Sequence, residues 1–185
     1  MNTLGNSRYR FIEEIIEESV FSLLKRRKYD DFSIKEICHE ANINRSTFYA
    51  HFADINDLLL KIESKMSKKI ELIFKPTDDV YDFQVFVTMF DFIKENRFFY
   101  KAFLKGNYGV SVESEMIKKI RPYFRAVITR KGLNYSDNEA LYHMLFFTGG
   151  LKLICARWLE HNCLETSQEM AKVIVDEYLN NANYF

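Results

Sequence analysis

Four consecutive polar residues could read the edges of DNA bases. They are Asn44, Arg45, Ser46 and Thr47, at the start of a short helical segment. A recognition helix places its N-terminal residues against base edges in the major groove. There Arg45 could donate two hydrogen bonds to guanine, Asn44 could read adenine and Thr47 could touch a thymine methyl group. A good bidentate pair supplies about 1–3 kcal/mol of discrimination.

The segment before this edge predicts two helices. From Ser7 to Lys28, apolar residues recur at steps of three and four, which indicates an amphipathic helix with one buried face. Ser33 is a good N-cap for a second helix over residues 34–40, and Glu36 three residues later completes a capping box.

A tight turn then leads into the third helix. Asn42 lies in that turn and is one of the few non-glycine residues that tolerate a left-handed backbone. Asn44 can cap the third helix, over residues 45–52. Phe48 and Phe52 lie four residues apart on the face opposite the base-reading edge and should pack on the first helix. Two short helices on a longer first helix predict a helix-turn-helix.

The segment 32–59 resembles the N-terminal DNA-binding domain of TetR-type transcriptional regulators. The resemblance covers the first third of the chain. It is most specific at Thr47-Phe48-Tyr49-Ala50-His51-Phe52, followed by Asp54 and Leu58-Leu59. This resemblance implies an all-α protein whose helix-turn-helix is joined by a long helix to a C-terminal dimerisation and ligand-binding domain.

The resemblance adds three residues to the expected DNA contacts. Tyr49 and His51 should face outward and resemble the family's phosphate- or base-contacting pair, and Ser33 resembles a position whose hydroxyl meets a phosphate. Two positions depart from the pattern, because Asn42 replaces the usual glycine and Ile55 replaces a lysine that lies on the DNA backbone. The expected DNA-binding residues are Ser33, Asn44, Arg45, Ser46, Thr47, Tyr49 and His51.

Charge decides how the N-terminal segment could meet DNA. The chain carries 26 basic and 26 acidic side chains, so no global field attracts a polyanion. Residues 1–60 contain eight basic and ten acidic side chains, a net charge of −2. Lys28, Lys35 and Arg45 could still share one DNA-facing surface. A helical ligand-binding or adaptor protein that has lost DNA binding is the open alternative, favoured by this charge and by Ile55.

The rest of the chain also reads as helical, with 6 Gly, 2 Pro and 48% apolar residues. Asp54 can cap a long helix that Pro76 closes. We therefore expect a DNA-binding domain over residues 1–53, a linking helix over 54–76 and a helical domain over 77–185. The helices expected in the last domain cover residues 81–94, 96–105, 112–131, 138–161 and 167 to about 181.

One apolar stripe on the helix over 138–161 needs a partner. Gly149 and Gly150 would permit close helix approach, and in TetR-type regulators the last two long helices form a four-helix dimer interface. A symmetric dimer would set two recognition helices about 34–36 Å apart, for a pseudo-palindromic operator. The expected dimer residues are Leu141, Leu145, Thr148, Leu151, Cys155, Trp158, Ile174 and Tyr178.

Aromatic residues between the linking helix and the dimer helices could line an apolar pocket. The resemblance implies a small apolar or aromatic effector there and a repressor that responds to it. The alternative is that these rings simply fill a helical core. The candidate ligand residues are Phe86, Phe90, Phe103, Tyr123, His143 and Phe147.

The remaining features exclude other classes of protein. Cys38, Cys155 and Cys163 form no C-x-x-C pair, and one must stay unpaired, which indicates a reducing cytoplasm. The N-terminus lacks signal-peptide order. The apolar stretch 140–159 carries a histidine, a lysine and an arginine, so we expect a buried helix and no membrane span. Neither a metal-ligand set nor a cofactor loop or catalytic motif occurs, so we expect no metal, no cofactor and no enzyme.

Overall fold

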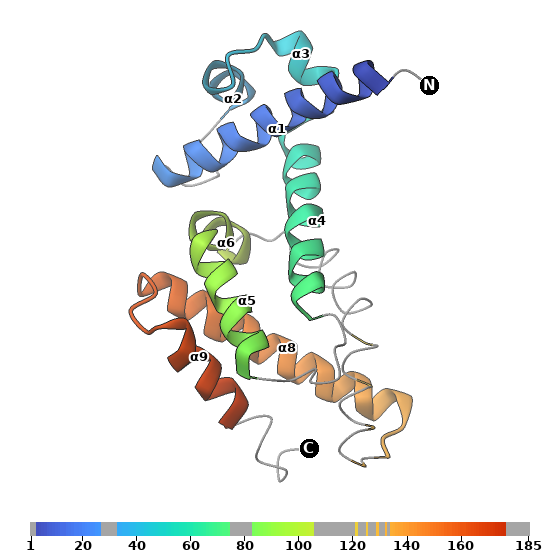
Figure 1. The fold of residues 1–185 in the computed structure, drawn as a ribbon, viewed down its shortest axis with the longest axis vertical. Helices are drawn as coiled ribbons and strands as arrows, with labels where there is room; N and C mark the ends of the chain where they lie inside the picture. Colours follow the sequence, from blue (N-terminus) through green and yellow to red (C-terminus); the bar gives the residue numbers. More distant parts are fainter. Residues whose placement is uncertain are drawn as a thin grey trace. The chain divides into compact units, whose positions relative to one another are not determined.

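The chain folds into two compact helical units, Met1–Met66 and Ser67–Phe185. The computed structural model describes residues 3–26, 33–74, 83–105, 121, 125, 129, 132 and 134–176. Every regular element in these residues is a helix, which confirms the expectation of an all-α protein (Figure 1). None of the described helices is long and apolar enough to cross a membrane.

The first unit holds the predicted helix-turn-helix. α1 (Thr3–Arg26) is the long support, and α2 (Ile34–Glu40) and α3 (Arg45–Tyr49) lie on one side of it (Figure 1). The first unit has an apolar core, whose burial stabilises the two short helices against α1. The core side chains that are less than 2% exposed are Ile16, Val20, Ile37, Phe48, Phe52, Leu58 and Ile62.

In the first unit, one end of α1 and one end of α3 differ from the prediction by three residues or more. α1 begins at Thr3, four residues before the predicted start at Ser7. α3 ends at Tyr49, three residues early, because the His51 amide turns back to the carbonyl oxygen of Phe48 at 3.0 Å. This shorter i→i−3 bond tightens the backbone and ends the α-helix.

Local hydrogen bonds confirm the predicted caps. Ser33 and Glu36 form a capping box at the start of α2. Asn42 has a φ of +52°, in the left-handed region that the turn requires. The side chain of Asn44 accepts the amide of Thr47 at 2.7 Å and begins α3.

α4 (Ile55–Ile73) begins in the first unit and ends in the second. Asp54 Oδ1 accepts the amide of Asp57 at 2.8 Å, and Asp57 Oδ2 accepts the amide of Ala53 at 2.9 Å. This reciprocal pair makes Asp54 the N-cap that the sequence indicates. The predicted end of the helix at Pro76 lies outside the described residues.

The second unit contains two packed helix pairs. α5 (Phe83–Glu95) contacts α9 (Ser167–Ile174), and α6 (Arg97–Lys105) contacts α8 (Asp137–Glu160). These four helices confirm the predicted ones, although the predicted end of the last lies beyond the described residues. The helix predicted over residues 112–131 also lies almost wholly outside them.

The side chain of Trp158 joins three parts of the second unit. Its ring meets the ring of Phe90 edge to face, with centroids 5.4 Å apart, and its Nε1 donates to the carbonyl oxygen of Glu165 at 3.1 Å. Thr166 then caps α9 in a capping box with Glu169. The indole of α8 therefore fixes both α5 and the turn that leads into α9.

Replacing Asn42 tests the turn of the helix-turn-helix. Asn42→Ala should lower the free energy of unfolding by about 1 kcal/mol, because a left-handed backbone costs an ordinary residue about 1–2 kcal/mol. Asn42→Gly should not lower it, since glycine adopts this conformation without that cost. Urea unfolding of the full chain, followed by circular dichroism, measures both variants. Equal stability of the two variants would contradict this explanation.

Candidate nucleic-acid interface

The N-terminus of α3 is ordered by its own side chains. Asn44 Oδ1 accepts three hydrogen bonds, from Thr47 N at 2.7 Å, Ser46 Oγ at 2.7 Å and Thr47 Oγ1 at 2.8 Å. A bidentate contact with adenine needs both the oxygen and the nitrogen of an Asn amide. In this structure Ser46 and Thr47 already donate to the oxygen of Asn44. The residue therefore orders the start of α3 and keeps only its amide N–H groups for a base.

The other residues of this edge face solvent. Arg45 and Ser46 are exposed, Thr47 is half-buried and Tyr49 is 55% exposed. Phe48 lies behind them with no exposed surface. One side of α3 therefore holds the helix in the core, while the other presents a guanidinium, hydroxyl groups and a phenol.

The N-terminus of α2 is occupied by its own carboxylate. Glu36 Oε2 accepts the Ser33 amide at 2.8 Å and the Ser33 hydroxyl at 3.0 Å. A phosphate at Ser33 would have to displace this negatively charged group before it could accept the same donors. The predicted phosphate contact thus requires Glu36 to rotate away from the helix end.

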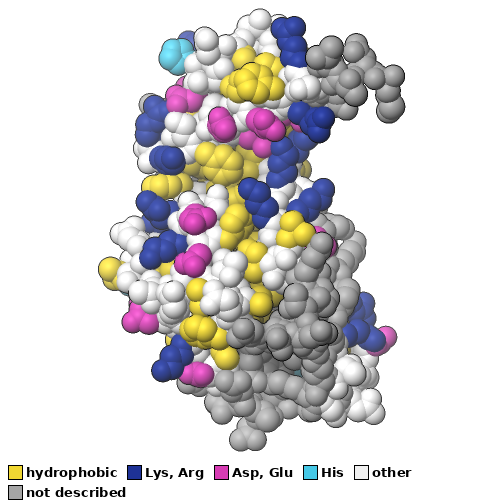
Figure 2. Space-filling model, viewed as in Figure 1, with side chains coloured by type: hydrophobic (Ala, Val, Ile, Leu, Met, Phe, Trp, Pro, Cys, Tyr) yellow, Lys and Arg dark blue, Asp and Glu magenta, His cyan; other side chains and the backbone are white. Residues whose placement is uncertain are grey.

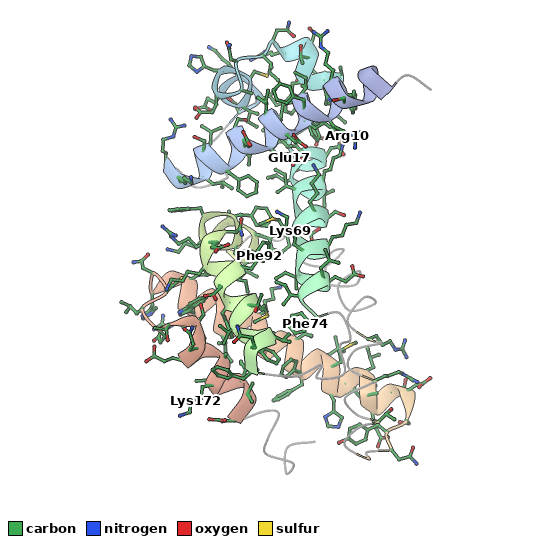
Figure 3. The ribbon with its side chains drawn as sticks, in the orientation of Figure 1. Arg10, Glu17, Lys69, Phe74, Phe92 and Lys172 are labelled. Atoms are coloured by element: carbon green, nitrogen blue, oxygen red, sulfur yellow. The ribbon has the colours of Figure 1, made fainter. Side chains whose placement is uncertain are left out.

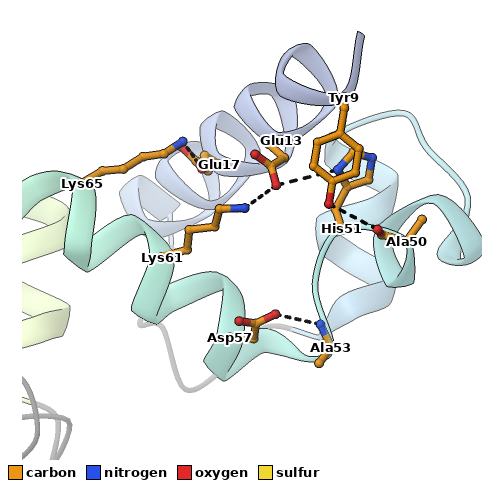
Figure 4. Close-up of polar contacts among 9 residues, drawn as sticks. All are labelled: Tyr9, Glu13, Glu17, Ala50, His51, Ala53, Asp57, Lys61 and Lys65. Atoms are coloured by element: carbon orange, nitrogen blue, oxygen red, sulfur yellow. Dashed lines mark hydrogen bonds and ion pairs between the residues drawn. The ribbon is translucent and has the colours of Figure 1, made fainter. Parts of the chain in front are cut away.

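The prediction that His51 faces outward is wrong. Its side chain is 7% exposed, and its ring lies against the ring of Tyr9 with centroids 4.0 Å apart (Figure 4). His51 Nδ1 lies 3.9 Å from Glu13 Oε1, and Tyr9 donates its hydroxyl to the carbonyl oxygen of Ala50 at 3.4 Å. Side chains of α1 cover the imidazole, which a pattern confined to α3 could not indicate.

Two buried carboxylates of α1 bind two lysines of α4. Glu13 pairs with Lys61, and Glu17 Oε1 lies 2.5 Å from Lys65 Nζ (Figure 4). The carboxylates are nearly buried, whereas both lysines keep about two-fifths of their side-chain surface exposed. Partial burial lowers the pKa of Lys61, but its hydrogen bond and charge interaction with Glu13 outweigh this, and the pKa lies above its usual value.

The paired residues are hereafter the α1–α4 ladder, formed by Glu13, Glu17, Lys61 and Lys65. Sequence analysis missed the ladder, because it counted charges only over residues 1–60, and both lysines of the ladder, Lys61 and Lys65, lie beyond that range. A detectable signal was present: the two acids and the two bases each lie four residues apart, which places them on one face of their helices.

The ladder explains why the net charge of −2 over residues 1–60 does not argue against DNA binding. Glu13 and Glu17 are neutralised by α4, and Glu40 binds Arg26 and accepts the Ser22 hydroxyl at 2.6 Å. Basic and acidic side chains are interspersed on the face drawn in Figure 2. The acidic residues that outnumber the bases therefore need not oppose DNA, because several are paired within the protein.

The candidate ligand residues lie in different packing environments. Phe86 and Phe90 are fully buried on α5, where Phe86 meets Phe74 edge to face at 5.7 Å between ring centroids. His143 of α8 stacks on Tyr135. The structure brings Phe103 against Phe99 and Phe147 against the cluster of Ala140 and Met144, whereas Tyr123 lies outside the described residues.

Three predicted dimer residues are buried within one chain. Cys155, Trp158 and Ile174 are at most 5% exposed, so they belong to the core of the second unit and not to a surface. Burial raises the pKa of the Cys155 thiol to about 12, which keeps it protonated in this apolar site. This corrects the prediction, since periodicity alone did not show which side of α8 faces inward.

The other predicted dimer residues lie closer to the surface. Leu145 is 39% exposed, and Leu141, Thr148 and Leu151 are half-buried. Tyr178 lies outside the described residues. Sequence analysis missed a more exposed apolar stripe on α8, with exposed fractions of 66%, 74% and 73% for Tyr142, Phe146 and Leu153.

No cluster within the described residues resembles a metal site. His, Cys, Asp and Glu side chains there form no group of three that could hold an ion. The three cysteines are free and buried.

Two family models match the chain. "Bacterial regulatory proteins, tetR family" matches residues 20–62, and "Transcriptional regulator C-terminal region" matches residues 83–177. The two matches fall on the helix-turn-helix unit and on the helices of the second unit.

Solved structures share the fold. One, "Dihydroxyacetone kinase operon activator DhaS", is 19% identical, with a TM-score of 0.66, and the match covers 94% of this chain and 97% of that one. Another, a tetR-family transcriptional regulator from Streptomyces coelicolor, is 16% identical with a TM-score of 0.69, covering 90% of this chain and 78% of that one. No curated protein matches the chain.

Removing Lys61 tests the α1–α4 ladder. Lys61→Met should lower the free energy of unfolding by about 2 kcal/mol, because it leaves the buried carboxylate of Glu13 without its cation. Combining it with Glu13→Gln should recover part of the loss, since the uncompensated charge is then gone. Urea unfolding measures both variants.

Lys68→Met is the matched control, because it removes the same group from an exposed position of α4. If Lys61→Met and Lys68→Met lower stability equally, the ladder contributes nothing specific.

Proposed function

Because the chain belongs to the tetR family of bacterial regulatory proteins and is a DNA-binding transcriptional regulator, we propose that it is a ligand-responsive repressor. In this proposal it binds a pseudo-palindromic operator as a homodimer. The observation that carries operator binding is the polar, solvent-facing side of α3, held in place by a buried phenylalanine.

Arg45 and Tyr49 supply the central DNA contacts in this proposal. The Arg45 guanidinium has a fixed donor geometry that matches the O6 and N7 acceptors of guanine. Tyr49 lies one turn further along α3, where its phenol could donate to a phosphate or a base. Ser46 and Thr47 complete the edge, while Asn44 holds its first turn.

The homodimer would use the exposed stripe of α8. Tyr142, Phe146 and Leu153 recur at steps of four and seven residues, so they share one side of the helix. Beyond the backbone of α8 itself, a Cβ added at Gly149, between them, would meet none of the described atoms within 4 Å, which leaves room for a partner helix. Burial of three large apolar side chains favours association of two copies. A twofold axis would then match the symmetry of a pseudo-palindrome.

The effector response would act through α4. Near its end, Phe74 packs on Phe86 of α5, and Lys69 Nζ lies 5.9 Å from the ring centroid of Phe92 (Figure 3). A small apolar or aromatic ligand that displaces one of these rings would move the end of α4. The part of α4 nearer its start carries Lys61 and Lys65, which bind α1 in the ladder. A ligand that favours one position of α4 would therefore change the position of α1 and of the recognition helix, and with it the affinity for the operator.

Operator binding tests the proposed function directly. The wild-type protein should prefer a duplex from the region upstream of its own gene over a scrambled duplex by about a thousandfold. Arg45→Ala should weaken operator binding by about 10–100-fold and relax the preference at one base pair. Fluorescence anisotropy with labelled duplexes measures both effects.

Lys172→Ala is the control, because it removes an equal charge from the exposed side of α9. Equal, weak binding of the wild-type protein to both duplexes would favour a helical adaptor that has lost DNA binding. Equal operator affinity of Arg45→Ala and Lys172→Ala would remove Arg45 from the base-reading edge.

A charge placed in the α8 stripe tests the homodimer. Phe146→Glu should convert dimers into monomers, because two buried carboxylates would face each other without partners. Sedimentation velocity measures the change. Leu164→Glu is the matched control, since Leu164 is 77% exposed in the turn after α8 and lies outside the stripe. Leu164→Glu should leave the dimer intact. If the dimer survives Phe146→Glu, the interface lies elsewhere.

A further inference from the structure

We propose that Arg8 binds a DNA phosphate beside the bases that α3 reads, as a contact outside the helix-turn-helix. The inference rests on the proposed function, because it assigns a further residue to the same DNA-binding surface. Three observations carry it: the attachment of α1 to the end of α3, the face of α1 on which Arg8 lies, and the charge of the first turns of α1.

The second turn of α1 is attached to the C-terminal end of α3. Tyr9 donates its hydroxyl to the carbonyl oxygen of Ala50 at 3.4 Å, and its ring lies on the ring of His51 (Figure 4). Ala50 is the C-cap of α3. Arg8, the residue before Tyr9, is therefore anchored close to the end of the recognition helix.

Arg8 and Arg10 lie on different sides of α1. Arg8 precedes Arg26 by eighteen residues, which are five full turns, so the two share one face. Arg26 binds Glu40 of α2, which identifies that face as the side where α2 packs. Figure 1 shows α3 on this same side of α1.

Arg10 faces α4 by the same reasoning. It precedes Glu17 by seven residues, about two turns, and Glu17 binds Lys65 of α4. Figure 3 labels both Arg10 and Glu17 on α1. Two arginines that are two residues apart thus differ in the side of the helix that they occupy.

A helix in the major groove is flanked by phosphates. The groove is about 12 Å wide, and a helix with its side chains is about 10–12 Å across, so elements beside the recognition helix face the backbone on the groove walls. Arg8 is exposed and stands on such an element. A guanidinium there matches the geometry of a phosphate.

Charge around Arg8 favours an anion. The first twelve residues contain two arginines and no acidic residue. The nearest carboxylate along α1 is that of Glu13, which is buried and bound to Lys61. The positive charge of Arg8 is therefore not offset by an acidic neighbour on its own turn of α1.

The experiment compares Arg8→Ala with Arg10→Ala in the full-length protein. Each variant loses one positive charge from an exposed residue of α1, so the change in net charge is the same. Dissociation constants are measured by fluorescence anisotropy for operator and scrambled duplexes at several salt concentrations. Thermal unfolding checks that both variants remain folded.

Arg8→Ala should reduce the slope of log K against log salt by about 0.9, because one phosphate contact is lost. Between 50 and 200 mM salt, the affinity advantage of the wild-type protein should then shrink about threefold. Both duplexes should be affected alike, since phosphates carry no sequence. Arg10→Ala should keep the wild-type slope, and Arg8→Lys should retain most of the contact.

A hydroxyl-radical footprint locates the contact. The wild-type protein should protect a sugar-phosphate position just outside the bases read by α3, and Arg8→Ala should lose that protection alone. Equal slopes for Arg8→Ala and Arg10→Ala, or an unchanged footprint, would overturn the inference and leave the proposed function intact. A wild-type protein without operator preference would overturn the proposed function, and one without any DNA binding would overturn both.

Discussion

The α1–α4 ladder is the interaction on which the DNA-binding unit depends. Glu13 and Glu17 are nearly buried, and each carboxylate is paired with a lysine ammonium group of α4, Lys61 for Glu13 and Lys65 for Glu17. Because the four residues lie on matching faces, the pairs hold α4 against α1 at two consecutive turns. Through Tyr9, the same part of α1 also holds the end of α3. One set of contacts thus positions both the recognition helix and the helix that continues into the second unit.

The recognition helix is too short to be stable alone. α3 has five residues, and isolated helices of fewer than about 12–15 residues are marginal in water. Its geometry comes from Asn44, which binds three donors at one end, and from Phe48, which is buried against the core. A rigid edge loses little conformational entropy when it binds, so its polar groups can meet base edges without first being ordered.

In the second unit, α8 is apolar on more than one side. Trp158 and Cys155 of α8 point into the core, where the indole also binds the turn before α9. Tyr142, Phe146 and Leu153 remain exposed on the same helix. The buried and the exposed apolar residues of α8 therefore differ, and periodicity alone could not tell them apart, which is why the pattern assigned core residues to the predicted interface.

The sequence by itself determined the helices and their caps. Ser33, Asn42 and Asn44 act on backbone groups within four residues of themselves, so their roles follow from residue type and spacing. Only the tertiary structure decided the surroundings of side chains whose partners lie far away in the sequence. The burial of His51 beneath Tyr9 is one such case, and the neutralisation of Glu13, 48 residues before Lys61, is another. Periodicity shows that a helix has an apolar face, but only packing selects which neighbour covers it. The reason is that the hydrophobic effect is non-directional and favours any apolar neighbour.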